Sequence, residues 1–528
     1  MIRKLSVLLL FAAACRESKT PGEKPLHGGT IVISAVSQPD VLFPPLTLST
    51  EERVVTELVY EYLADVGPGM NTIGDAGFVK GIASSWKWNA DSTAISFEIN
   101  PAARWQDGNP VTAKDVAFSF ATYTSAALAS PAASSLADID SVTMTSPVTV
   151  VFWFKRKTPH QFYDAAAQML ILPAHLLEQI PADSLRTRAA ALTPVGSGKF
   201  RFAGLHRGES FEVRAVENHY RGRANADRIV WIVSPDYNAA LMRLTAAEAD
   251  VMQNVRVESL EQLRKRGTFN IVSLPGMDYV FLQFNMRRPL LASRDLRRAL
   301  TMSLDRESMV KNLFDTLAAV PIGPTVRAYP TTDTTIATIR YDTAAASRIL
   351  DSLGWRRSDP DGMRRKDGKS LRFTLILPST SAARKRIAVM IQEQLRRAGV
   401  SMKVEEMDYQ AFAHRQSNHQ FDGALAGWHL PSSTESVKGA WTTGGSENYG
   451  RYSNRIFDAL IDSALSASSV DASRGFFRRA YQIIVDDAPG IWLYEPRTLI
   501  AINKRIQITP MRPSAWWLDI SSWGLRAK

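Results

Sequence analysis

Residues 86–120 read WKWNADSTAISFEINPAARWQDGNPVTAKDVAFSF, and local rules divide this stretch into a strand, a turn and the beginning of a helix. Apolar and polar side chains alternate over Ala94–Ile99, and this period of two predicts a half-buried strand. Asp107-Gly108 and Asn109-Pro110 predict turns, because glycine tolerates a positive φ and proline fixes φ. The order of these elements sets the first expectation for the fold.

The end of the same stretch predicts a helix from Ala113, with Thr112 as its N-cap and Asp115 in its first turn, where the helix dipole is positive. The whole string resembles the signature of the family 5 solute-binding proteins of ABC importers, which bind peptides, nickel complexes and related solutes. The residues that carry the resemblance are Trp86, Phe97, Trp105, Asp107, Gly108, Pro110, Thr112, Ala113, Asp115, Val116 and Ser119.

The first residues are typical of an export signal, because an apolar run, Leu5–Ala14, follows two basic residues and is too short to cross a bilayer core of about 30 Å. The run ends in small residues before Cys15 and resembles a bacterial lipobox, although Ala12 stands where Leu is usual. The resemblance implies a signal peptide over 1–15, lipidation of Cys15 and an exported protein anchored on the periplasmic or cell-envelope face of a membrane. An ordinary secretory signal is the alternative. Residues 16–27 are polar and predict a flexible tether.

Length and charge narrow the class of protein. A chain of 528 residues is expected to form more than one domain, since single cores stop growing beyond roughly 250–300 residues. One cysteine cannot form an internal disulfide. The formal net charge of +11 is scattered in short basic pairs without interleaved aromatic residues, so no nucleic-acid partner is expected.

Periodicity predicts further elements along the chain. The expected strands are Thr30–Ala35, Val148–Phe154, Tyr279–Asn285 and Val400–Val404. The expected helices are Glu52–Leu63, Ala239–Ala249 and Arg384–Ala398, the last ended by Gly399. Strands and helices mix throughout, so the class is α/β or mixed α+β.

The resemblance covers roughly residues 28–510 and implies a two-lobed, periplasmic-binding-protein-like clamp with an inserted third domain. Carried onto this chain, the first lobe comprises 28–60, 190–277 and 498–528. The inserted domain spans 61–189, and the second lobe spans 278–497.

The expected ligand cleft receives the strand that ends at Trp428-His429. In peptide-binding members of the family, an Asp soon after this Trp pairs with the ligand's α-ammonium. No Asp follows here, and Glu435 and Glu447 are the nearest acids that could take that role. Core packing is the alternative for Trp428.

Strand period and the resemblance together give a set of candidate ligand-binding residues, for which structural roles are the alternative. The set is Ser37, Phe281, Gln283, Asn285, Trp428, His429, Asn448 and Tyr449.

Other motifs favour simpler interpretations. Gly196-Ser197-Gly198-Lys199 lacks the first glycine and the closing hydroxyl of a phosphate loop, so a turn is expected. The histidines are dispersed and expected at the surface, and the closest pair, His414 and His419, does not fit a common helical metal site. No acid–base pair can be assigned from the sequence, so no catalytic residue, metal or cofactor is expected.

The sequence therefore predicts the substrate-binding component of an ABC importer. Its expected partners are a peptide-like solute and the transmembrane subunits of a permease, and a monomer is expected. The alternatives are a binder of a modified peptide, a sugar or a chelated metal, a ligand-sensing lipoprotein, and an exported enzyme, for which no catalytic constellation is present.

Overall fold

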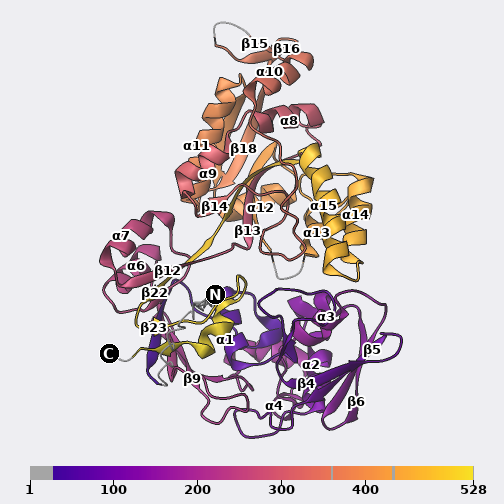
Figure 1. The fold of residues 1–528 in the computed structure, drawn as a ribbon, viewed down its shortest axis with the longest axis vertical. Helices are drawn as coiled ribbons and strands as arrows, with labels where there is room; N and C mark the ends of the chain where they lie inside the picture. The colour runs from indigo at the N-terminus through magenta and orange to yellow at the C-terminus, as the bar shows by residue number, and fades with distance from the viewer. Residues whose placement is uncertain (1–27, 358–360, 431–433, 527–528) are drawn as a thin grey trace, which may run out of the picture.

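The structure is a computed structural model that describes residues 28–357, 361–430 and 434–526. The chain forms a mixed α/β fold with two bodies, one above the other in Figure 1, joined by crossing segments of chain. Cys15, the signal peptide and the tether lie outside the described residues.

The lower body contains a seven-stranded sheet in the order β12-β22-β11-β1-β10-β9-β8. Its strands are β1 (Thr30–Ala35), β8 (Phe200–His206), β9 (Ser210–Ala215), β10 (Arg228–Val233), β11 (Val251–Met252), β12 (Phe269–Leu274) and β22 (Thr498–Asn503). The associated helices are α1 (Thr50–Val59), α6 (Tyr237–Thr245) and α7 (Leu260–Arg266). We call this sheet and its helices the first lobe. Its strands come from three separate parts of the chain.

A four-stranded antiparallel sheet, β4-β5-β7-β6, lies beside the first lobe (Figure 1). Its strands are β4 (Ala83–Trp88), β5 (Ala94–Ile99), β6 (Ile139–Ser146) and β7 (Thr149–Phe154). Its helices are α2 (Ala113–Tyr123), α3 (Gln161–Ala167), α4 (Ala174–Leu177) and α5 (Ala182–Arg188). We call this part the insert. Ile95, Phe97 and Ile99 are buried in its core, as the period of two predicts.

The upper body, the second lobe, is built on a six-stranded sheet in the order β14-β21-β13-β20-β18-β19. Its strands are β13 (Asp278–Phe284), β14 (Ala318–Ala319), β18 (Arg372–Pro378), β19 (Ser401–Met407), β20 (Gly423–His429) and β21 (Gly490–Pro496). Its helices are α8 (Arg294–Met302), α9 (Arg306–Phe314), α10 (Thr343–Ser352), α11 (Ala382–Arg397), α12 (Tyr409–Ser417), α13 (Ser436–Trp441), α14 (Arg455–Leu465) and α15 (Val470–Asp487).

Short elements complete the fold. A small sheet at the far end of the second lobe comprises β15 (Arg356–Arg357), β16 (Arg364–Lys366) and β17 (Lys369–Ser370). The remaining pairs are β2 (Ala64–Asp65) with β3 (Val79–Lys80), and β23 (Ile506–Gln507) with β24 (Gly524–Leu525). Single 3-10 turns lie at Pro44–Leu46, Pro131–Leu136, Ala189–Ala191, Val257–Ser259 and Trp516–Ser522. Within the described ranges, no helix is long and apolar enough to cross a membrane.

Strand β5 has the predicted bounds, and helix α2 begins at the predicted residue, Ala113. Thr112 and Asp115 form a capping box, in which the Asp115 carboxylate accepts the Thr112 backbone N–H at 2.8 Å. The predicted helix Glu52–Leu63 is shifted, since α1 spans Thr50–Val59. The helix ends early because the Val59 carbonyl accepts hydrogen bonds from outside the helix, at 2.8 Å from the Gly198 amide nitrogen. This contact is invisible in the local sequence.

Two segments connect the lobes, one between β12 and β13 and one between β21 and β22. They touch where Gly276 faces Pro496, since a Cβ placed on Gly276 would lie 1.7 Å from the Pro496 carbonyl oxygen. The ion pair between Glu258 of the first lobe and Arg386 of α11 also spans the junction. These contacts form a compact crossing at which the lobes can pivot.

Candidate functional site

The lower body meets the second lobe through one apolar cluster, to which the insert contributes, and we call it the interlobe cluster. Val66, Met70 and Tyr163 contribute to it from below, and Tyr279, Phe281, Tyr329, Trp441 and Trp492 from the second lobe. Aromatic rings make up its upper half, with ring centroids 5.3 Å apart for Phe281 and Trp441 and 5.1 Å apart for Trp441 and Trp492. Side chains from both bodies therefore bury one another where they meet.

Trp428 and Tyr449 extend the interlobe cluster as a stacked pair, with centroids 6.0 Å apart and an interplanar angle of 24°. Both side chains are half-buried. The Trp428 indole N–H is buried and has no hydrogen-bond partner among the described residues. A buried donor without a partner costs free energy, so this N–H is suited to an incoming acceptor.

Glu447 lies beside this pair as a half-buried carboxylate, and it forms no ion pair or side-chain hydrogen bond within the described residues. Burial raises its pKa above the usual value. Burial also raises the pKa of Tyr449, and the nearby Glu447 adds to that shift. Because a desolvated carboxylate needs compensation, this position favours a cationic group.

A second acidic site joins the insert to the second lobe. Burial raises the pKa of Asp164 in α3 to about 8, and the charges of Glu435 and Asp138 raise it further, whereas Arg156 opposes them. Glu435 precedes α13 in the second lobe, so a carboxylate of one body acts on the pKa of a carboxyl group in the other. Burial lowers the pKa of His160, against the effect of Glu435.

Four of the candidate residues are buried inside the second lobe. The Asn285 amide donates to the carbonyls of His419 and Phe421, at 2.9 and 3.0 Å. Asn448 donates to two carbonyls of its own loop, and Phe281 belongs to the interlobe cluster. Gln416 donates to Gln283 at 3.1 Å. These contacts are structural in this conformation, and ligand contact by the four residues stays a prediction.

The other two candidates are exposed. Ser37 follows β1 in the loop that precedes α1. His429 ends β20, and its Nδ1 lies 3.1 Å from Oδ1 of Asp278 on the paired strand. Neither residue is brought to the Trp428–Tyr449 pair by a contact in the structure.

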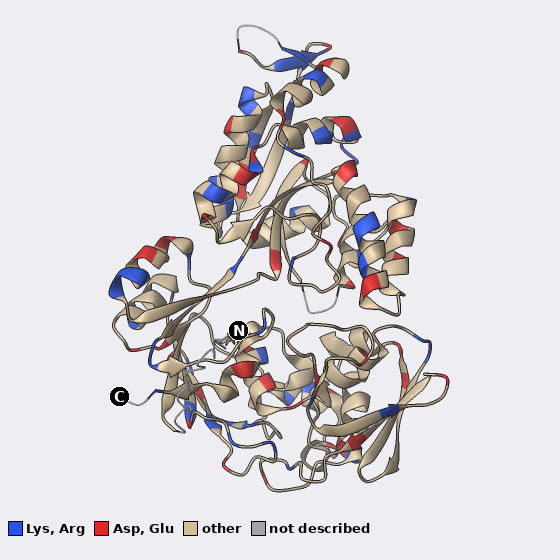
Figure 2. Cartoon of the chain, viewed as in Figure 1, with Lys and Arg blue, Asp and Glu red and all other residues tan. Residues whose placement is uncertain are grey.

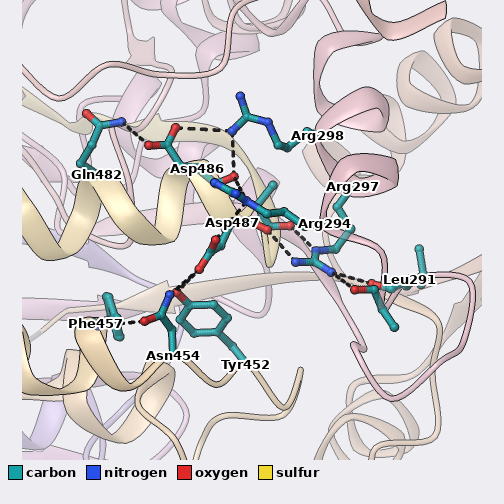
Figure 3. A network of polar contacts seen from close by, with 12 residues as sticks. Leu291, Arg294, Arg297, Arg298, Tyr452, Asn454, Phe457, Gln482, Asp486 and Asp487 are labelled. Carbon is teal, nitrogen blue, oxygen red and sulfur yellow. Dashed lines mark hydrogen bonds and ion pairs between the residues drawn. The ribbon is translucent and has the colours of Figure 1, made fainter. Parts of the chain in front are cut away.

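The motif that follows Tyr449 is structural rather than part of the site. Tyr452 and Asn454 both donate to Oδ2 of Asp487, each at 2.8 Å, and Figure 3 shows both side chains converging there. Arg294 of α8 forms an ion pair with the other oxygen of the same carboxylate at 3.1 Å. Arg297 donates to the carbonyls of Asp487 and its neighbours (Figure 3). The network fixes α15 to α8 and to the loop behind Tyr449.

The histidine prediction is wrong for His160 and His219, which are buried and hydrogen-bonded to the carbonyls of Thr72 and Ser197. Within the residues that the structure describes, no group of three or more His, Cys, Asp or Glu side chains could hold a metal ion.

Sequence reasoning missed Val66, Met70, Tyr163 and Asp164. No local motif marks them, and they lie far in sequence from the strands they face. These residues become informative only when one knows that their part of the chain packs against the second lobe, beside strand β20 with its Gly427 and Trp428.

The chain matches a known protein family over most of its length. The family model for bacterial extracellular solute-binding proteins, family 5 Middle, matches residues 77–450. The oligopeptide-binding protein AppA of Bacillus subtilis (strain 168) is 28% identical over 99% of this chain and 98% of its own length. The probable D,D-dipeptide-binding periplasmic protein DdpA of Escherichia coli (strain K12) is 24% identical over 90% of each chain.

The fold is shared with solved structures. The structure of Bacillus subtilis AppA in complex with a nonapeptide superimposes with a TM-score of 0.77 at 26% identity, covering 96% of this chain and 100% of that chain. Members of the matched family are solute-binding proteins rather than enzymes. This chain belongs to the family 5 bacterial extracellular solute-binding proteins.

Proposed function

We propose that this chain is the peptide-binding component of an ABC importer, which captures short peptides between its lobes and delivers them to the transmembrane subunits of a permease. Family membership and the peptide-binding names of its relatives support this proposal. Opening about the crossing at Gly276 and Pro496 would separate the two sides of the interlobe cluster and admit the ligand, and closure would enclose it.

The observation that carries the proposal is the uncompensated Glu447 carboxylate beside the Trp428–Tyr449 pair. The Asp that peptide-binding members place after their Trp is missing here, and Glu447 supplies a carboxylate in its stead. The α-ammonium of a peptide would neutralise Glu447, while the aromatic pair would contact the first side chain or peptide plane. The free indole N–H of Trp428 would donate to a peptide carbonyl.

The test is calorimetry with a panel of short peptides on the wild type, Glu447→Gln and Glu435→Gln. Losing the partner of a buried charge costs roughly 3–5 kcal/mol, so we expect Glu447→Gln to bind peptides over a hundredfold more weakly. Glu435→Gln tests the other acid that the sequence offers for this role, and Asp183→Asn, an exposed change in the insert, is the matched control.

Two outcomes would contradict the proposal at different points. Equal affinity of Glu447→Gln and the wild type would exclude Glu447 as the ammonium partner. A wild type that binds no peptide would exclude peptides as the ligand and would favour a solute without a free α-ammonium, such as a modified peptide, a sugar or a chelated metal.

The remaining candidate residues belong to the same proposal. Ser37 and His429 are exposed and would reach the ligand from the two lobes on closure. Gln283, Asn285, Phe281 and Asn448 would support the pocket wall, since their side chains are buried behind it. We also propose the domain limits predicted from the sequence, with the insert spanning 61–189 and the second lobe spanning 278–497.

We also propose that the protein is exported and held to a membrane by a lipid on Cys15, acting as a monomer. The extracellular family and the lipobox-like sequence before Cys15 support this. A ligand-sensing role would use the same pocket, and a permease gene beside this one would favour transport.

A further inference from the structure

The end of the second lobe that lies farthest from the first lobe carries a concentration of basic residues (Figure 2). We call this region the basic tip; it comprises β15, β16, β17 and the adjoining ends of β18, α10 and α11. Its exposed basic side chains are Arg348, Arg356, Arg357, Lys366, Lys369, Arg372, Arg396 and Arg397. Residues 358–360 are not part of it.

The register of the small sheet sets like charges against each other. Arg356 pairs with Arg365, Arg357 with Arg364, and Lys366 with Lys369. Like charges directly opposite in a sheet are destabilising. These three pairs are therefore repulsive. The remaining cross-strand pair of the small sheet joins Arg365 to the uncharged Ser370.

The acids nearby relieve the repulsion only in part. Asp351 pairs with the buried Arg364, and Asp361 with Arg365. Glu393 pairs with both Arg396 and Arg397. The side chains of Arg356, Lys369 and Arg372 are exposed and form no hydrogen bond or ion pair with any described residue. The free cations thus gather on one surface while the acids are committed elsewhere.

A recess lies beside the hairpin. A cavity of about 480 Å³ is lined by three arginines, Arg357, Arg364 and Arg397, and by one acid, Asp305, whose carboxylate caps α9. Arg364 is fully buried and anchored to the Ala398 carbonyl, the Trp355 carbonyl and Ser347, so it fixes the floor. Arg357 and Arg397 stand exposed at its rim. A cluster of guanidinium groups on a recess is suited to phosphate oxygens.

We infer that the basic tip is a membrane-contact surface that binds the phosphate groups of anionic phospholipids. Repulsion between opposed basic side chains would be offset by a negatively charged bilayer, and the recess would receive a headgroup phosphate. Contact through the tip would hold the long axis of the protein at a defined angle to the membrane that carries its permease. Basic residues at sheet edges also prevent strand-to-strand aggregation, and that role alone predicts no lipid binding.

The test is co-sedimentation of the chain from residue 16 onward, which keeps every described residue and lacks Cys15, with vesicles of phosphatidylcholine or of phosphatidylcholine with phosphatidylglycerol. We expect binding to the anionic vesicles only, weakened by salt. Each basic residue near such a surface contributes about 1 kcal/mol, so removing three should weaken binding by ~100-fold. The tip variant is Arg356→Gln with Lys369→Gln and Arg372→Gln.

The matched control removes three exposed basic residues from the end of α7, through Arg264→Gln, Lys265→Gln and Arg266→Gln. This variant should retain binding, because α7 lies on the first lobe (Figure 1). Equal losses in both variants, or no binding by the wild type, would overturn the inference. Millimolar inorganic phosphate that abolishes binding at constant ionic strength would also overturn it, since the tip would then recognise free phosphate. Peptide affinity should be unchanged in both variants.

Discussion

At the scale of single residues, Gly276 is constrained by its neighbour across the crossing. A side chain at this position would strike the Pro496 carbonyl, since its Cβ would lie 1.7 Å from that oxygen. This contact can be relieved only if the backbones of the two connecting segments move apart. We expect Gly276→Ala to lower the free energy of unfolding by about 1–3 kcal/mol and to weaken ligand-dependent closure, as measured by chemical denaturation and solution scattering.

Gly475 is the natural control for this substitution. It lies exposed within α15, and a Cβ there would meet nothing within 4 Å. Gly475→Ala should raise stability by about 1 kcal/mol, because alanine is the better helix former. If Gly276→Ala were as stable as Gly475→Ala, the close approach of the two connecting segments would not matter.

At the scale of elements, α1 depends on a single carboxylate. Glu52 accepts backbone N–H groups from Asp40, Val41, Leu48 and Ser49, at 2.7 to 3.3 Å. It thereby holds the loop that carries Ser37 against the beginning of the helix. Burial opposes its charge, but the four donors outweigh burial, and the pKa of Glu52 is lowered.

A lowered pKa gives stability that is present above the ordinary carboxyl pKa and lost as the pH falls through the lowered one. We expect Glu52→Gln to lower the free energy of unfolding by about 2 kcal/mol at pH 7, with a smaller difference once the pH falls below the lowered pKa and the wild-type carboxylate is protonated. Denaturation over a series of pH values from 7 downward measures this. Glu51→Gln shares the helix-dipole effect but not these bonds, so a similar loss there would contradict the role given to Glu52.

At the scale of the whole molecule, the interaction between the carboxyl groups of Asp164 and Glu435 makes closure sensitive to pH. Burial and the charges of Glu435 and Asp138 raise the pKa of Asp164 to about 8, and Arg156 opposes this shift. The charge of Glu435 also acts on the neighbouring His160 and Tyr163 of the insert. A raised carboxyl pKa gives stability that is fully present below the ordinary pKa and lost as the pH rises through the raised one. The closed arrangement should therefore weaken towards pH 9.

We expect Asp164→Asn to flatten this dependence, since the uncharged amide has no proton to lose. The free energy of unfolding of the wild type should fall by up to about 1.4 kcal/mol per pH unit. This fall is confined to the pH range in which Asp164 is protonated in the folded protein but not in the unfolded chain. Melting temperatures and radii of gyration at pH 5, 7 and 9 measure both effects. Asp183→Asn, an exposed change in the same insert, should follow the wild type. Parallel pH profiles for the wild type and Asp164→Asn would rule out this coupling.

The sequence by itself determined the elements and the family. Period-two alternation located β5, capping residues located the beginning of α2, and Gly399 marks the end of α11, where its φ is +82°. These features depend on neighbours a few residues apart, so local rules suffice to predict them. The residues of the signature stretch likewise sufficed for the family, because its motifs are contiguous.

Only the tertiary structure decided which polar groups are free. Asn285 lies on a predicted strand and Asn448 in a segment predicted to border the cleft, yet backbone carbonyls occupy the amides of both. Glu447 directly precedes Asn448 in the sequence, and its carboxylate has no ion pair or side-chain hydrogen bond among the described residues. The end of α1 at Val59 and the effect of Glu435 on Asp164 were decided in the same way. The physical reason is common to all four, since hydrogen-bond saturation, burial and charge compensation depend on groups that folding brings together from distant parts of the chain.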